Sequence, residues 1–224
     1  MISTKALSKD YGSKRALNNI SSQINKGMIN GLVGPNGSGK TTLIHCLLNQ
    51  LDYTGNIHWT HDQCTLFFIP DENILPDLLS GAEYLSFIES LYKVSNPQLK
   101  EELLASFDMS VDYHKAINAF SYGMKKKIQL IAALIVAPDI LILDEIFRGL
   151  DMKAILDTKK FLKDYVRKGK TVLLSSHDIL SIEQLCQSVM FLVKGELRAF
   201  GAPIDLLKEH SSDNLEELFI ELMQ

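Results

Sequence analysis

The chain has 224 residues, of which 46 % are hydrophobic and 22 % are charged, and its formal net charge is −4. This composition is that of an ordinary globular protein with enough residues for one full core, and the acidic balance disfavours a dedicated nucleic-acid binder. The three cysteines are far apart and odd in number, so they indicate neither a disulfide framework nor a zinc site. We therefore expect reduced thiols in the cytosol.

The first third of the chain predicts short strands around a glycine-rich loop. Residues 1–33 are expected to form three strands, and Asn25-Lys26-Gly27 predicts a hairpin turn between the second strand and the third, at 28–33. A helix is expected at 39–49, because apolar residues recur there at helical spacing. Two further strands are expected at 57–59 and 66–69.

The composition changes after Pro70, and residues 71–120 predict mostly helix. Ser80-Gly81-Ala82-Glu83 matches a capping box, in which the first and fourth side chains satisfy free amides of a helix start. Asn96-Pro97 predicts a second helix, because proline is favoured in the first turn. We expect one domain over residues 1–224, made of an α/β core (1–70 and 138–224) and an inserted helical subdomain (71–137).

From residue 121 the predicted elements alternate between helix and strand. The strands are continuous apolar runs, as expected of a parallel sheet that is covered on both faces. Gly169 is a plausible end of a helix. The expected order is a helix to 136, a strand at 140–143, a helix at 152–166, a strand at 171–175, a helix at 179–186, a hairpin of 189–193 with 197–200, and two short helices.

The segment Gly34–Thr42 fits the phosphate-loop pattern G-x-x-x-x-G-K-[ST] between a strand and a helix. Glycines let the backbone wrap a polyphosphate, and the loop amides with the positive end of the helix face its oxygens. Lys40 would contact the β- and γ-phosphates, and the Thr41 hydroxyl would bind Mg²⁺. The fold class is therefore an α/β P-loop NTPase with a mainly parallel core sheet. The expected ATP contacts in the loop are Gly34, Asn36, Gly37, Ser38, Gly39, Lys40, Thr41 and Thr42.

Two carboxylates follow the apolar strand at 140–143. Ligands of such folds bind at the carboxyl edge of the parallel sheet, where Asp144 and Glu145 would lie. Asp144 would bind Mg²⁺, and Glu145 would polarise the water that attacks the γ-phosphate. The alternative is a solvated acidic pair that merely ends a strand.

Nearly the whole chain resembles the nucleotide-binding subunit of ATP-binding cassette (ABC) transporters. Phe120-Ser121-Tyr122-Gly123-Met124 stands where that family has its Leu-Ser-Gly-Gly-Gln signature, with Ser121 and Gly123 kept. Ser121 would cap the signature helix and form an anion site with its amides. The resemblance implies a head-to-tail dimer with two ATP molecules at its interface, in which Ser121, Gly123 and Asp151 contact ATP held by the opposite subunit.

The resemblance also assigns residues outside the signature. His177, at the end of a predicted strand, matches the family's switch histidine, and Tyr11 matches the aromatic residue that stacks on adenine. The alternatives are a surface histidine and an edge-strand tyrosine. Gly149-Leu150-Asp151 matches the family's loop after the strand that ends in Asp144 and Glu145. Ile146 replaces the usual proline in this loop, and Arg148 is unusual there.

The sequence departs most from the family at the glutamine loop, where Asp71 takes the place of the glutamine. A carboxylate there could still hold Mg²⁺-bound water, and the choice between Asp71 and Glu72 stays open. The run Lys125-Lys126-Lys127 is interpreted as a solvated helix face. Residues 71–80 are expected to receive a permease helix, with Leu75 or Leu78 exposed.

The expected function is an ATPase subunit that dimerises on ATP and powers export by a separate membrane permease. The most apolar stretch, 128–143, is too short and too interrupted to span a bilayer, so we expect a protein at the cytoplasmic face of the membrane. No nucleic-acid partner is expected. The alternatives are a soluble ABC protein acting on nucleic acid or the ribosome, and a non-hydrolysing regulatory cassette. Whether the dimer is formed by identical chains stays open.

Overall fold

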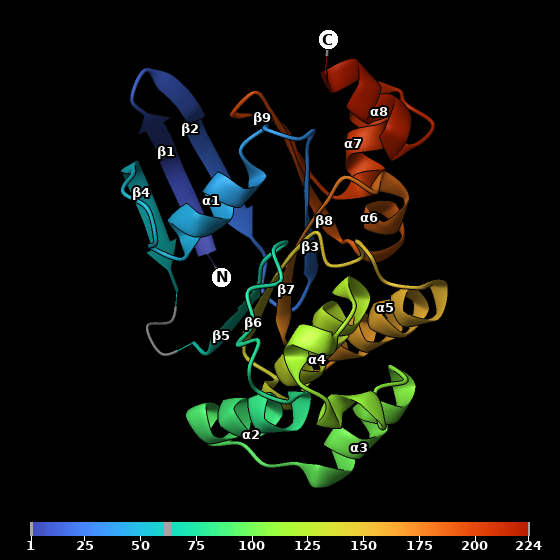
Figure 1. The fold of residues 1–224 in the computed structure, drawn as a ribbon. Coiled ribbons are helices and arrows are strands. Elements are labelled where there is room, and N and C mark those ends of the chain that lie inside the picture. Colours follow the sequence, from blue (N-terminus) through green and yellow to red (C-terminus); the bar gives the residue numbers. More distant parts are fainter. Residues whose placement is uncertain (1, 61–63, 224) are drawn as a thin grey trace.

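The computed structural model describes residues 2–60 and 64–223, so Met1, residues 61–63 and Gln224 of the predicted domain lie outside the described part. The described strands form two sheets (Figure 1). A three-stranded antiparallel sheet has the order β2-β1-β4, and a six-stranded sheet has the order β5-β6-β7-β3-β8-β9. In the larger sheet only β9 runs antiparallel to its neighbour. This arrangement agrees with the predicted α/β fold class.

The strands lie close to their predicted positions. Their bounds are β1 (Ile2–Tyr11), β2 (Lys14–Ile24), β3 (Ile29–Val33), β4 (Thr54–Trp59), β5 (Leu66–Ile69), β6 (Ile140–Asp144), β7 (Thr171–Ser176), β8 (Ser188–Val193) and β9 (Glu196–Gly201).

The helices include two short 3₁₀ turns before the signature helix. Their bounds are α1 (Lys40–Leu47), α2 (Gly81–Tyr92), α3 (Pro97–Ser106), η1 (Asp112–His114), η2 (Ile117–Ala119), α4 (Tyr122–Val136), α5 (Met152–Arg167), α6 (Ile179–Leu185), α7 (Pro203–His210) and α8 (Leu215–Leu222).

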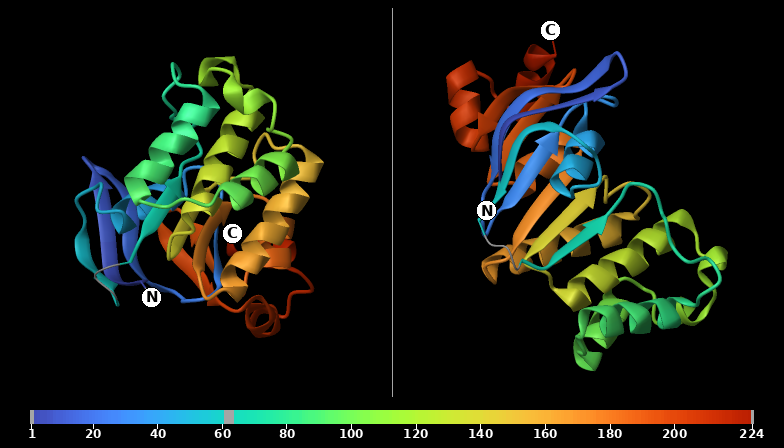
Figure 2. Two further views of the ribbon diagram at one scale, coloured as in Figure 1. Left: turned by 90° about the horizontal axis from the view of Figure 1, so that it is seen from below. Right: turned by 90° about the vertical axis from the view of Figure 1, so that its left-hand side faces the viewer.

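The six-stranded sheet is covered on both faces, and this explains its continuous apolar strands. Alternate residues of β6 point to opposite faces, since side chains in a strand alternate. Leu141 and Leu143 belong to one buried cluster together with α4, α5 and α6, whereas Ile140 and Ile142 belong to a second one with α1 and the antiparallel sheet. Figure 2 shows these two layers on either side of the sheet.

The predicted hairpin between β2 and β3 is wrong. β2 pairs with β1, and β3 lies between β7 and β8, parallel to both. Both edges of β3 are thus occupied, so the turn at Asn25–Gly27 carries the chain from one sheet to the other. The Asn30 side chain stabilises this crossing, since it accepts a bond from the Asn25 amide at 2.8 Å and donates to the Asn25 carbonyl at 3.0 Å.

The predicted helix starts between residues 71 and 137 are confirmed. Ser80 and Glu83 form the capping box of α2, and Asn96 caps α3 with proline in its first turn. Ser121 caps α4 by accepting from the Met124 amide at 3.2 Å. These three helices lie together at one end of the molecule, shown at the bottom of Figure 1. The division of the chain at residues 70 and 138 stays a prediction.

The lysine run in α4 is not a solvated face, and that interpretation is wrong. Lys126 is 0 % exposed, and its Nζ donates to the Pro70 carbonyl at 2.6 Å. Burial lowers the pKa of Lys126 to about 8. The two neighbouring lysines form ion pairs, Lys125 with Asp77 and Lys127 with Asp151. These lysines are removed from solvent by tertiary contacts, because loops from distant parts of the chain pack against the first turns of α4.

Candidate functional site

The phosphate loop joins β3, at the centre of the six-stranded sheet, to α1. Two of its glycines are required by the geometry. A Cβ on Gly34 would lie 2.2 Å from the Leu192 carbonyl oxygen, and Gly39 has a φ of +108°, where side chains are strained. The loop therefore keeps a tight curve directly before a helix N-terminus, where backbone amides and the helix dipole favour an anion.

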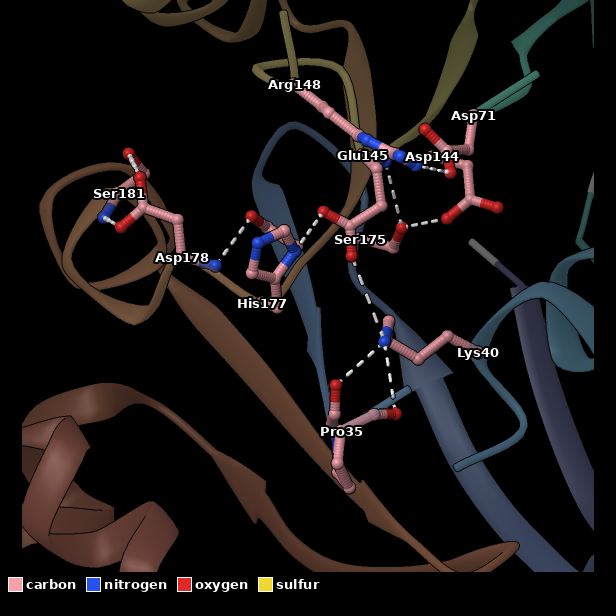
Figure 3. Close-up of polar contacts among 12 residues, drawn as sticks. Pro35, Lys40, Asp71, Asp144, Glu145, Arg148, Ser175, His177, Asp178 and Ser181 are labelled. Atoms are coloured by element: carbon pink, nitrogen blue, oxygen red, sulfur yellow. Dashed lines mark hydrogen bonds and ion pairs between the residues drawn. The ribbon is translucent and has the colours of Figure 1, made fainter. Parts of the chain in front are cut away.

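Lys40 is nearly buried and faces back over the loop (Figure 3). Its Nζ donates to the Gly34 carbonyl at 2.7 Å and to the Pro35 carbonyl at 3.4 Å, and it lies 3.8 Å from Oε1 of Glu145. Burial lowers the pKa of Lys40, and the nearby carboxylates, Glu145 foremost, oppose that effect. The ammonium is thus held at the loop by weak partners that a phosphate could replace.

The loop also contains a buried polar atom without a partner. Ser38 is 2 % exposed, and its Oγ has no hydrogen bond with any residue that the structure describes. Native proteins pair nearly all buried hydroxyls, so such an atom calls for an explanation. A bound polyphosphate supplies one, because its oxygens accept hydrogen bonds. The Ser38 hydroxyl, Lys40 and the glycine curve together fit a nucleotide phosphate chain.

Thr41 and Asp144 provide adjacent oxygen donors. Thr41 Oγ1 donates to Asp144 Oδ2 at 2.9 Å, and the other Asp144 oxygen accepts from the Ser175 hydroxyl. Among residues 2–60 and 64–223, no cluster of three or more acidic, histidine or cysteine side chains could hold a metal by itself. One hydroxyl and one carboxylate suit Mg²⁺, which keeps several waters and shares ligands with phosphates. These two residues would hold it here.

Glu145 and His177 meet across neighbouring strands. Asp144 at the end of β6 pairs with Ser175 in β7, so the residues that follow each strand lie side by side. Glu145 Oε2 lies 2.7 Å from His177 Nδ1, as Figure 3 shows. Glu145 has a φ of +50°, and its amide donates to the Ser175 carbonyl at 3.1 Å, which holds this bent backbone. The two residues form one unit at the edge of the sheet.

A pocket of about 480 Å³ collects most of the predicted residues. Its lining includes Tyr11, whose ring is 47 % exposed, and the acidic residues Asp71, Asp144 and Glu145. An exposed aromatic ring at the mouth can stack on a base, since stacking buries its face. The predicted phosphate-loop residues that line this pocket are Asn36, Gly37, Gly39, Lys40, Thr41 and Thr42.

Sequence reasoning missed three cations at this pocket. Lys14 and Arg15 begin β2, and Lys194 lies in the turn between β8 and β9. The Gly195 amide donates to the Ser38 carbonyl at 2.9 Å, which brings that turn against the phosphate loop. In the sequence, Lys194-Gly195 predicts only a turn, so its proximity to the site could not be predicted.

At the glutamine loop, the structure places Asp71, and not Glu72, on the nucleotide pocket. Glu72 lines a neighbouring hollow of about 510 Å³, which Asp71 also borders. Asp71 Oδ2 accepts from Arg148 Nη1 at 2.8 Å. The geometry therefore favours Asp71 for the position beside the phosphate loop, and its role in holding Mg²⁺ stays a prediction.

Six predicted site residues do not line this pocket: Gly34 and Ser38 of the phosphate loop, His177, which contacts the pocket residue Glu145, and Ser121, Gly123 and Asp151. Ser121 is exposed at the start of α4, and Asp151 is exposed at the start of α5, where it accepts from the Ala154 amide at 2.8 Å. A Cβ on Gly123 would lie 2.6 Å from the Gly149 carbonyl oxygen, so the first turn of α4 touches the loop before α5. None of Ser121, Gly123 and Asp151 lines the 480 Å³ pocket of its own chain. Their contact with ATP held by another subunit stays a prediction.

Comparisons with known proteins agree with this geometry. The family described as "ABC transporter" matches residues 17–148. The lantibiotic transport ATP-binding protein SrtF of Streptococcus pyogenes is 32 % identical, with 98 % of this chain and 96 % of SrtF covered. A solved ATP-binding subunit of an ABC transporter has a TM-score of 0.91 at 27 % identity, covering 99 % of each chain. A dimeric ATP-binding cassette bound to ADP and Pi has a TM-score of 0.79 at 22 % identity, covering 90 % of this chain and 98 % of its own, and shows the same fold.

Proposed function

This chain belongs to the ABC transporter family as one of its ATP-hydrolysing subunits, and we propose that it dimerises on ATP and powers export through a separate membrane permease. The observation that carries the proposal is that Lys40, the Thr41–Asp144 pair and Glu145 line one pocket at the carboxyl edge of the sheet. His177 holds Glu145 from outside the pocket lining. Such a set both binds a nucleotide and positions a base.

The chemical step rests on Glu145. Its carboxylate takes a proton from the attacking water, and His177 holds the carboxylate through a hydrogen bond of 2.7 Å. Lys40, now held by two loop carbonyls, neutralises the charge that develops on the γ-phosphate. Mg²⁺ bound at Thr41 and Asp144 would supply further charge neutralisation and orient the phosphates.

The dimer completes the site. Ser121 caps α4 with its hydroxyl at the helix N-terminus, and both are exposed to a second subunit. Gly123 lies in the first turn of α4, which contacts Gly149 in the loop that leads to Asp151. The dimeric cassette bound to ADP and Pi has this fold, which supports a paired arrangement. We therefore assign Ser121, Gly123 and Asp151 to the ATP of the opposite subunit.

The permease surface is assigned to residues 71–80. Ile74 and Leu78 are 74 % and 89 % exposed, whereas Leu75 and Leu79 pack against the core. The prediction that Leu75 or Leu78 is exposed is thus confirmed. Exposed apolar side chains beside a nucleotide-responsive loop suit an amphipathic helix of a partner.

The place of action is the cytoplasmic face of a membrane, with another chain crossing it. No helix within the described residues is long and apolar enough to span a bilayer. Among the exporter subunits for drugs, antimicrobial peptides or lipids that the sequence resembles, the name of SrtF, lantibiotic transport, and its similarity over 98 % of this chain favour a peptide cargo. The cargo itself would be bound by the permease.

Steady-state phosphate release by the purified chain in Mg²⁺ and ATP tests the enzymatic part of the proposal, with Lys40→Ala as the control. We expect turnover in the parent, little in the control, and stimulation when the chain is purified in complex with its membrane permease. A parent no more active than Lys40→Ala, alone and with the permease, would contradict the proposed function.

A further inference from the structure

Two residues that depart from the family pattern are partners in the folded chain. Asp71 replaces the expected glutamine, and Arg148 is unusual in the loop that precedes α5. The two are 77 positions apart, yet Arg148 Nη1 donates to Asp71 Oδ2 at 2.8 Å (Figure 3). The ion pair joins the loop after β5 to the loop after β6, and both loops border the nucleotide pocket.

The rest of Asp71 is also engaged. The Tyr122 hydroxyl at the start of α4 lies 3.2 Å from Asp71 Oδ1 and 3.0 Å from the Asp71 carbonyl oxygen. On the preceding residue, the buried Lys126 ammonium donates to the Pro70 carbonyl at 2.6 Å. The single Tyr122 hydroxyl hydrogen is thus shared between the Asp71 carbonyl and Oδ1, while Arg148 donates to Oδ2.

The pocket that Asp71 borders is lined by three carboxylates and also by Lys14, Arg15, Lys40 and Lys194. Asp71, Asp144 and Glu145 all line it, and Lys40 already lies beside Glu145. An unpaired Asp71 would add a further negative charge facing a polyphosphate, and like charges in one pocket repel. Arg148 removes that repulsion as long as the pair is intact. Its side chain is 61 % exposed, so it can move into solvent, and the Asp71 side chain that it would leave is 31 % exposed.

We propose that Arg148 is a positioning residue that competes with Mg²⁺ for the Asp71 carboxylate. Without the divalent cation, Arg148 holds Asp71 and the site tolerates the phosphates. When Mg²⁺ and its waters are present, Asp71 turns to them and releases Arg148. The pair thereby sets how strongly nucleotide binding depends on Mg²⁺. This inference rests on the proposed nucleotide site and adds a role for a residue that the family pattern does not use.

The test compares the affinity for a fluorescent ATP analogue in Mg²⁺ and in EDTA. The ratio of the two affinities measures the coupling between cation and nucleotide. Arg148→Ala should raise this ratio by about two- to fivefold, the range expected of an exposed ion pair. The rise should come mainly from weaker binding in EDTA, where the uncovered carboxylate repels the phosphates. Arg148→Lys should stay close to the parent, since it keeps the charge.

A control in the Asp71→Asn background separates competition from a structural effect. There Arg148→Ala should leave the ratio unchanged, because no carboxylate remains to be shared. An unchanged or lower ratio in Arg148→Ala with Asp71 present overturns the inference, and so does a rise that persists in Asp71→Asn. The proposed function has its own test. If Lys40→Ala does not weaken nucleotide binding, the proposed nucleotide site is wrong and the inference about Arg148 falls with it. Failure of the inference alone is thus distinguishable from failure of the proposed function.

Discussion

The carboxylate of Glu145 lies 2.7 Å from Nδ1 of His177, although the two residues are 32 positions apart in the chain. The parallel register of β6 and β7 creates this contact, because Asp144 pairs with Ser175 and the next residues leave the sheet together. The other oxygen of Glu145 faces Lys40 at 3.8 Å. Glu145 is therefore fixed between Lys40 and His177, which is compatible with the general-base role that we propose for it.

Glu145→Gln should retain ATP binding and lose most of the turnover. The amide keeps the shape and can still bond to His177, but it cannot take a proton, and a positioned base is worth about 10²–10⁴ in rate. Phosphate release and equilibrium nucleotide binding measure the two effects. The variant should also accumulate as an ATP-bound dimer on gel filtration. Turnover within about threefold of the parent would contradict this role.

Ser121→Arg should leave one ATP bound per chain and block hydrolysis, because Ser121 is exposed and lies outside its own chain's pocket. Mixing Ser121→Arg with Lys40→Ala chains is the sharper test. A mixed dimer has one composite site with both changes and one with neither, so partial ATPase activity should return. If mixed dimers are shown to form and no activity returns at any ratio, the shared site is wrong.

Leu78→Asp should abolish co-purification with the permease and leave basal ATPase activity unchanged. Leu78 is 89 % exposed, so a charge there costs little folding energy, but it would be buried without a partner in an apolar interface. Ile220→Asp is the matched control, since Ile220 is 56 % exposed and belongs to α8, which lies at the other end of the molecule from α2, the helix that follows residues 71–80 (Figure 1). Retained complex formation by a folded Leu78→Asp variant would place docking elsewhere.

Asp139→Asn should destabilise the fold at neutral pH and have a smaller effect in acid. Hydrogen bonds from Lys170 and from Thr65 lower the pKa of Asp139 to about 2, below its ordinary value of 3.8. The ionised form therefore stabilises the fold above pH 3.8, and this contribution is lost as the pH falls toward 2. Thermal melts of parent and variant across this range measure the difference, and a difference independent of pH would contradict it.

Features set by neighbouring residues could be predicted from the sequence. Ser80 with Glu83, and Asn96 with proline after it, cap helices because the capping groups lie within one turn of each other. The phosphate loop is local in the same sense. Its glycines, Lys40 and Thr41 occupy one continuous segment between a strand and a helix, so the motif predicts both the geometry and the ligand.

The predictions that are wrong concern contacts between distant segments of the chain. The hairpin at Asn25–Gly27 was predicted from a turn that is compatible with several pairings, and only the occupation of both edges of β3 by β7 and β8 excludes it. Lys126 was assigned to solvent because a run of three lysines is usually hydrated. Its burial depends on the Pro70 loop closing over α4, which the local sequence does not encode.

The sequence by itself therefore determined the nucleotide class and the family, and it predicted which residues touch phosphate, because these follow from local backbone geometry and a continuous motif. Only the tertiary structure decided which distant side chains meet. The register of β6 and β7 joined Glu145 to His177, and the approach of two loops joined Asp71 to Arg148. The physical reason is that hydrogen bonds and ion pairs act over a few ångströms, so their partners are fixed by folding and not by sequence separation.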